Sequence, residues 1–105
     1  MPKFDDVFVG SKLSIDRAWQ LEQCVCIAKN VCLENDISFL EMISQRIAKN
    51  VVSARHKYFA RAYATTKASL VTIGEAIDKD HTTVIYGLNK YRNKQKYNAW
   101  LAEKP

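Results

Sequence analysis

The run Asp80-His81-Thr82-Thr83 places a carboxylate, an imidazole and two hydroxyl groups at consecutive positions. An Asp beside a His suggests half of a catalytic dyad, but the sequence places no serine or cysteine nucleophile beside the pair. Adjacent residues at a helix start also do not form a triad. We therefore predict that the chain is not an enzyme and that these four side chains exchange hydrogen bonds with a partner.

Positive charge gathers in the same part of the chain. Residues 1–44 hold four basic and seven acidic side chains, whereas residues 45–105 hold twelve basic and four acidic ones. A basic half of this kind is typical of proteins that bind a polyanion, because each Lys or Arg near a phosphate releases a condensed counterion. Charge alone leaves a second interpretation open, namely a solvated basic face without a partner.

Composition limits the fold to one small domain. The 105 residues allow one modest core, and 48% apolar with 26% charged residues is the balance of an ordinary globular protein. Both prolines, Pro2 and Pro105, stand at the ends of the chain, so long helices are allowed. No apolar run is long enough to span a bilayer, and residues 1–14 lack a leader pattern. We therefore expect a cytoplasmic protein with a natural start at Met1.

The three cysteines, Cys24, Cys26 and Cys32, form neither a disulfide pattern nor a metal pattern. Their odd number fits a reducing compartment. Residues two apart on a helix diverge by about 200°, and no fourth ligand for zinc is obvious. We predict that all three are buried as small hydrophobes and that the chain holds no metal or cofactor.

Apolar residues recur at helical spacing in five segments, which predicts an all-α fold. Residue types that cap helix N-termini precede four of the segments, at Asp16, Ser38, Ser69 and Asp80. The predicted helices cover residues 16–33, 39–43, 51–64, 70–77 and 81–92. Only Asp78-Lys79 separates the last two helices, which is the tight connection of a helix-turn-helix.

The last predicted helix has a buried side and an outward side. Val84, Leu88 and Tyr91 follow the spacing of a buried stripe. The outward side then carries the remaining polar and aromatic residues: His81, Thr82, Thr83, Tyr86 and Lys90. Residues 93–105 could extend the helix or fray, and Trp100 with Leu101 favours docking of this tail onto the body.

The run from Ser69 to Val84 closely resembles the C-terminal DNA-binding domain of DnaA, the bacterial replication initiator. It combines Ile73-Gly74 with Asp80-His81-Thr82-Thr83-Val84. Upstream positions also match the family without a gap: Ile37-Ser38, Ile43-Ser44, Arg46, Val51-Val52, Ala54-Arg55, Ala62, Thr66 and Ser69-Leu70. The resemblance covers roughly residues 24–95 and implies a helix-turn-helix of the DnaA C-terminal, Trp-repressor-like type.

The resemblance implies that Asp80, His81, Thr82 and Thr83 read bases of double-stranded DNA. Short polar residues in the first turn of a recognition helix can reach base edges in the major groove. Gly74 is expected where two helices approach closely. Phosphate contacts are predicted for basic and hydroxyl side chains that fix register without reading sequence: Arg46, Lys49, Arg55, Lys57, Arg61, Thr66, Lys67, Ser69 and Lys79.

Two positions depart from the family pattern. The run Ile77-Asp78-Lys79-Asp80 is one residue shorter and has lysine for arginine, so we expect a slightly different angle of the recognition helix. Ile47 stands where the resemblance places a minor-groove arginine. Arg46 or Lys49 is the candidate substitute for that arginine.

The resemblance therefore implies a bacterial or phage-encoded, nucleoid-associated protein that binds double-stranded DNA sequence-specifically and regulates replication initiation or transcription. We expect no ATPase activity, since the chain has no glycine-rich phosphate loop. We also expect no small-molecule substrate and no membrane partner. The predicted division is an extension at 1–14, a binding domain at 15–95 with the helix-turn-helix at 69–92, and a tail at 96–105. A helical protein adaptor, a non-specific nucleic-acid binder, and a homodimer through the helix around Trp19 remain open.

Overall fold

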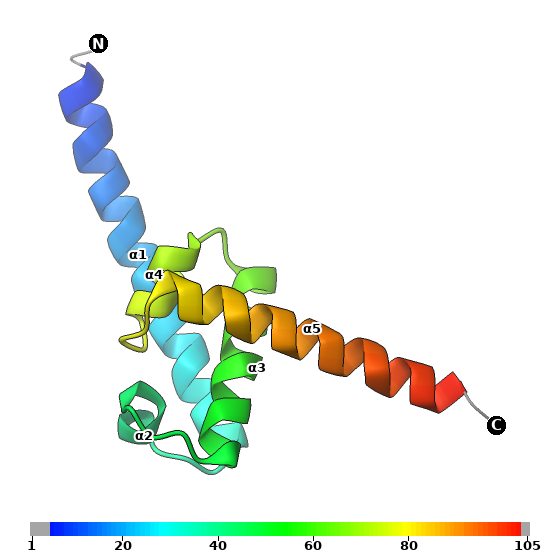
Figure 1. Ribbon diagram of the computed structural model, residues 1–105. Helices are drawn as coiled ribbons and strands as arrows, with labels where there is room; N and C mark the ends of the chain where they lie inside the picture. The colour runs from blue at the N-terminus through cyan, green and yellow to red at the C-terminus, as the bar shows by residue number, and fades with distance from the viewer. Residues whose placement is uncertain (1–4, 104–105) are drawn as a thin grey trace.

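The computed structural model describes the backbone of residues 5–103 and the side chains of residues 17–102. Its elements are α1 (Asp5–Glu34), α2 (Phe39–Ile43), α3 (Lys49–Thr65), α4 (Leu70–Glu75) and α5 (His81–Glu103), so the predicted all-α fold is confirmed. α1 and α3 lie side by side, α5 crosses them, and the outer ends of α1 and α5 project from the body (Figure 1). No helix in the described part of the chain is both long and apolar enough to cross a membrane.

The first helix is longer than its predicted range. It begins at Asp5, so the prediction that Asp16 caps its N-terminus is wrong. Its C-terminus is a Schellman turn, in which Ile37 N–H donates to Cys32 O at 3.1 Å and Asp36 N–H donates to Leu33 O at 3.4 Å. Asp36 has a φ of 56°, and buried Ile37 closes the end of the helix. The predicted extension at residues 1–14 lies outside the residues whose side chains are described.

The short helix α2 begins as predicted. Ser38 Oγ accepts from Glu41 N–H at 3.0 Å, and Glu41 Oε1 accepts from Ser38 N–H at 3.1 Å, which is a reciprocal capping box. Met42 turns into the core. Residues 44–48 then form the loop that leads to α3.

The core lies where α1, α3, α4 and α5 meet. Its largest fully buried side chains include Tyr58 and Phe59 of α3, Met42 of α2 and Ile73 of α4. Tyr58 keeps its buried hydroxyl satisfied by donating to Ile73 O at 2.6 Å, which ties the long helix to the helix-turn-helix. Gly87 of α5 is also buried, and a Cβ there would lie 2.5 Å from the ring of Phe59. Only glycine lets α5 approach α3 this closely.

The cysteines divide between core and surface. Cys24 and Cys32 are buried, as predicted, whereas Cys26 is exposed, so the prediction of burial is wrong at that position. The cause is helical geometry, because residues two apart cannot both face the core. No three His, Cys, Asp or Glu side chains gather as a metal site in the part of the chain with described side chains.

The predicted tail at residues 96–105 is, as far as Glu103, part of the last helix. α5 runs without a break from His81 to Glu103, and its end projects away from the body (Figure 1). Trp100 and Leu101 are 50% and 46% exposed, and the Trp100 ring lies 6.0 Å from that of Tyr97 on the same helix. The expectation that these residues dock onto the body is therefore wrong, because the helix carries them past it.

Candidate nucleic-acid interface

The helix-turn-helix is formed by α4, a turn at residues 76–80, and α5. Ser69 caps α4 as predicted, since its Oγ accepts from Thr72 N–H at 3.2 Å. α4 ends at Glu75, two residues before its predicted end. In the turn, Asp78 has a φ of 58°, a left-handed conformation that Asp tolerates better than most residues. This single left-handed residue lets a short connection reverse the chain.

Gly74 makes the close approach predicted for it. Its neighbours are the turn, at Lys79, as well as α5, at Val84. A Cβ at this position would lie 2.4 Å from Lys79 O and 3.2 Å from a Val84 methyl. Lys79 N–H also donates to Gly74 O at 2.8 Å. The missing side chain therefore fixes where the turn lies against α4 and where α5 begins.

The four predicted base-reading residues occupy the exposed start of α5. Asp80 Oδ1 accepts from His81 N–H at 2.8 Å and lies 3.0 Å from His81 Nδ1, while Oδ2 accepts from Thr82 Oγ1 at 2.9 Å. The Thr82 hydroxyl and the His81 backbone N–H hold the pKa of the Asp80 carboxyl below its usual value. The carboxylate thus orients His81 and Thr82, and Thr83 is exposed in the same turn.

Arg55, a predicted phosphate contact, is buried against the segment that precedes α3. It is only 7% exposed, and four of its N–H groups donate to carbonyl oxygens of the segment that includes the 44–48 loop. Nε donates to Met42 O at 2.9 Å, Nη1 to Arg46 O at 2.6 Å, and Nη2 to Glu41 O at 3.0 Å and Ser44 O at 2.7 Å. These bonds give the guanidinium a structural role and compete with the predicted phosphate contact, which stays a prediction.

Lys79 also binds this segment. Its Nζ donates to Ser44 O at 2.6 Å and to Ile43 O at 3.1 Å, at the C-terminus of α2. Burial lowers the pKa of this amine, and the nearby charge of Arg55 lowers it further. Ser44 O accepts from both cations, so the turn before α5 and the 44–48 loop are held to each other. This anchoring role competes with the predicted phosphate contact of Lys79, which stays a prediction.

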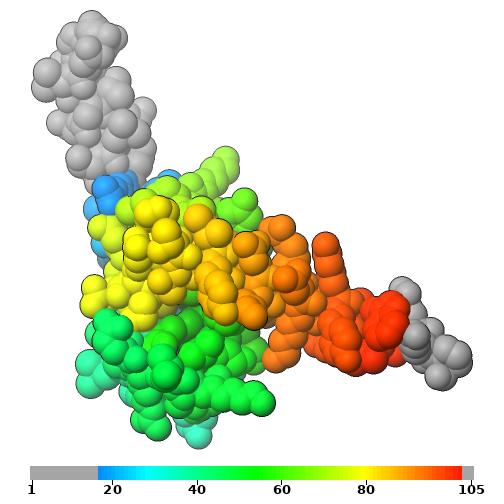
Figure 2. Space-filling view, in the orientation of Figure 1, coloured from blue at the N-terminus to red at the C-terminus, as the bar shows by residue number. Residues whose placement is uncertain are grey.

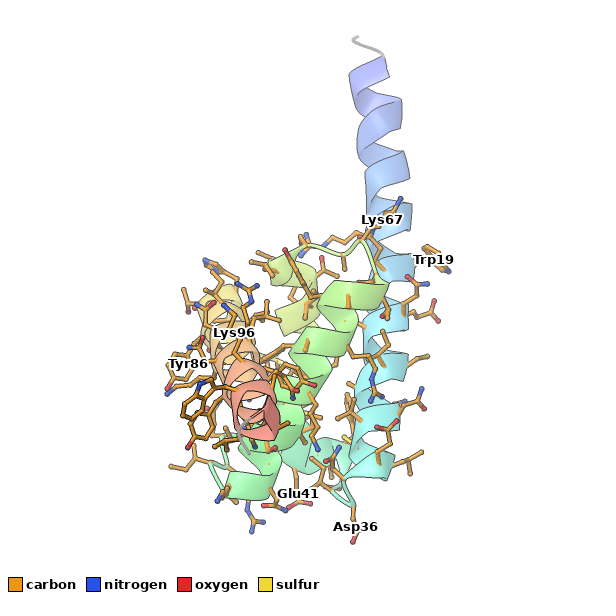
Figure 3. All side chains as sticks on the ribbon, turned by 90° about the vertical axis from the view of Figure 1, so that its right-hand side faces the viewer. Trp19, Asp36, Glu41, Lys67, Tyr86 and Lys96 are labelled. Atoms are coloured by element: carbon orange, nitrogen blue, oxygen red, sulfur yellow. The ribbon has the colours of Figure 1, made fainter. Side chains whose placement is uncertain are left out.

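The other predicted phosphate residues fall into three groups. Arg46, Lys49 and Lys67 are exposed and keep their predicted role as proposals. Figure 3 shows Lys67 beside α1, whereas Tyr86 lies on the outer side of α5. Thr66 and Ser69 use their hydroxyls locally, with Thr66 Oγ1 donating to the carbonyl four residues earlier at 2.8 Å.

Lys57 and Arg61 face the end of α1 instead. Lys57 Nζ donates to Asn35 Oδ1 at 2.9 Å, and Arg61 forms a bidentate pair with Glu34 at 2.9 and 2.8 Å. The pair raises the pKa of Arg61 and lowers that of Glu34. Arg61 is thus neutralised within the fold, which weakens its predicted role toward phosphate.

A groove of about 420 Å³ lies between α3 and α5, and the sequence prediction did not include it. Figures 1 and 2 show α5 crossing α3 and running outward above its N-terminal half, and the groove lies in the angle between the two helices. Its apolar floor includes Val52 and Tyr91, and its edges carry lysines from both helices. The lining residues are Ile47, Lys49, Val52, Ser53, His56, Lys57, Lys90, Tyr91, Lys94 and Gln95.

The family model of the bacterial DnaA protein helix-turn-helix matches residues 25–90 of this chain. The chain belongs to this family. It is therefore an all-α, DNA-binding helix-turn-helix of the DnaA type, a kind of domain that binds double-stranded DNA and is not itself catalytic. The match begins within α1 and ends at Lys90, so the last turns of α5 lie beyond it.

Curated relatives agree with the family. The chromosomal replication initiator protein DnaA of Caldanaerobacter subterraneus subsp. tengcongensis is 36% identical over 76 residues, which is 72% of this chain and 17% of that protein. The proteins of the same name from Thermoanaerobacter sp. and Thermoanaerobacter pseudethanolicus are 34% identical over the same spans. The chain thus corresponds to 17% of the length of these DnaA proteins. No solved structure matches it at a significant level.

Both departures from the DnaA pattern have a structural counterpart. The shorter turn is the one in which Asp78 takes its left-handed conformation and Lys79 reaches back to α2. Ile47 is 84% exposed at the tip of the 44–48 loop, where the resemblance places an arginine. Its neighbours Arg46 and Lys49 are exposed cations in the same segment and stay candidates for that contact.

Proposed function

We propose that this chain binds duplex DNA sequence-specifically, by inserting the first turn of α5 into the major groove. One observation carries the proposal: Asp80, His81, Thr82 and Thr83 are all exposed at the start of a helix in a DnaA-type helix-turn-helix. Their side chains can bond base edges, and Asp80 already orients two of them. The target is a site resembling those of DnaA initiators, and the process is replication initiation or nearby transcription.

Replacing His81 with Ala should remove much of the preference for the specific site while leaving the fold intact. The imidazole is half-exposed and contributes nothing to the core, so the melting temperature should not change. Loss of one good base-edge contact is worth about 1 to 3 kcal/mol, or roughly 5- to 150-fold in affinity for the matched duplex. Affinities of the variant for matched and scrambled duplexes, measured by fluorescence anisotropy, provide the test.

Asn98→Ala is a matched control for that experiment, because Asn98 is an exposed polar residue about five turns further along the same helix. The control should keep the full preference for the matched site. Binding to scrambled DNA should survive in both variants, since the basic residues are unchanged. If His81→Ala lowers the melting temperature and weakens binding to every duplex equally, the base-reading assignment is wrong.

We also propose that two copies can pair through α1. A dimer would read two half-sites on the DNA, which would compensate for the small reading surface of one copy. Trp19 supports this proposal because it is 60% exposed on α1. Sedimentation velocity of the chain and of Trp19→Ser should then show a dimer only for the unmodified chain. A monomer at all concentrations, with and without DNA, would rule out the pairing.

A further inference from the structure

The α3–α5 groove has a strong positive charge that the fold does not neutralise. Lys49, Lys90 and Lys94 line it, and neither α3 nor residues 81–102 of α5 contain an acidic side chain. Burial lowers the pKa of His56, which lies between these lysines, and the charges of Lys90, Lys94 and Arg55 lower it further. A half-buried imidazole surrounded by unneutralised cations marks a site that favours an anion.

The same helix that carries the base-reading turn also carries two of these lysines. Lys90 and Lys94 lie nine and thirteen residues after His81, or about 14 and 20 Å along the helix axis. The major groove is only about 12 Å wide, and α5 with its 23 residues is about 34 Å long. A helix that enters the groove end-on, with only its first turn at the base edges, therefore passes the sugar-phosphate strand that borders the groove.

We propose that the α3–α5 groove seats this bordering strand, with Lys49, Lys90 and Lys94 on its phosphates. The inference rests on the proposed function and adds a second contact region to it. An apolar floor suits the deoxyribose, because Val52 and Tyr91 can pack against sugar carbons while the lysines extend to the phosphate oxygens. The Lys90 amine also lies 5.4 Å from the centre of the Tyr86 ring, which holds this lysine on the outer edge of the groove.

Helix geometry supplies a matched pair of double variants. Residues 90 and 94 share one face of α5, whereas residues 92 and 96 point to the opposite side, about 200° away. Lys90→Ala/Lys94→Ala and Arg92→Ala/Lys96→Ala each remove two positive charges from the same exposed stretch of helix. Only the first pair lines the groove. Helix content by circular dichroism checks that both variants fold.

The measurement is the slope of log affinity against log salt concentration for the matched duplex. The groove variant should lose about 1.8 units of slope, because each phosphate contact contributes about 0.9. The control variant should lose less than about half a unit, and Lys90→Arg/Lys94→Arg should keep the original slope.

Equal slopes for the two alanine variants, with the preference for matched over scrambled DNA intact, would overturn the groove proposal alone. If the groove variant has the same slope as the unmodified chain, the groove proposal is overturned in the same way. If the unmodified chain shows no preference for the matched duplex, the proposed function fails, and the seating of the strand fails with it.

Discussion

Replacing Arg55 with Met should destabilise the fold more than any other single change proposed here. Met keeps most of the side-chain volume but removes the four donors that Arg55 provides to carbonyl oxygens at residues 41–46. Breaking a buried charged network of this kind costs about 3 to 5 kcal/mol. A domain of this size should then lose more than about 10 °C in melting temperature, measured by circular dichroism.

Arg46→Met is the matched control, because Arg46 is exposed and its side chain pairs with the partly exposed Glu41, at 3.1 Å. An exposed ion pair of this type is worth about 0 to 1 kcal/mol, so the melting temperature should move by a few degrees at most. If Arg55→Met melts at the same temperature as the unmodified chain and instead weakens DNA binding, the structural role given to Arg55 is wrong. The phosphate contact predicted from sequence is then the better explanation.

Alanine at Gly74 should destabilise the fold and also disturb the reading turn. An Ala at a Gly position inside a helix normally gains about 1 kcal/mol from propensity. Here the new Cβ would lie 2.4 Å from the backbone oxygen of Lys79, which cannot rotate away. The clash should outweigh the gain in helix propensity and lower the free energy of unfolding by about 1 to 3 kcal/mol. Because Lys79 directly precedes Asp80, the start of α5 must shift, and affinity for the matched duplex should fall more than affinity for scrambled DNA.

Val71→Ile adds one methyl group to the half-exposed side of the same helix and is the control for Gly74→Ala. Its stability should stay within about 0.5 kcal/mol of the unmodified chain. Chemical denaturation of both variants measures the difference. A Gly74→Ala chain that is as stable as the original, or more stable, would show that the turn can move aside at no cost.

The helix-turn-helix could be predicted from sequence because its signals are local. Ser38 and Ser69 cap α2 and α4 where the sequence places the caps, and α5 begins directly after Asp80. The helix limits that sequence could not fix are those without a stop signal nearby. No proline follows Arg92 until Pro105, so nothing local ends α5, and α1 likewise starts well before Asp16.

The role of Arg55 could not be predicted because its partners lie 9 to 14 residues earlier in the chain. Only the packing of α2 and the 44–48 loop against α3 brings those carbonyl oxygens to the guanidinium. The groove is a similar case, since it needs α3 and α5 together. One signal was present in the sequence: Lys90 and Lys94 are four residues apart in a stretch of α5 that contains no acidic residue.

The central claim is that the first turn of α5 reads base sequence in duplex DNA. The most direct test is the ratio of two dissociation constants of the unmodified chain at one fixed salt concentration. One duplex carries the binding site of a DnaA initiator, and the other has the same length and composition in scrambled order. Specific recognition predicts binding to the matched duplex that is tighter by on the order of 10³-fold. Equal dissociation constants for the two duplexes would contradict the account.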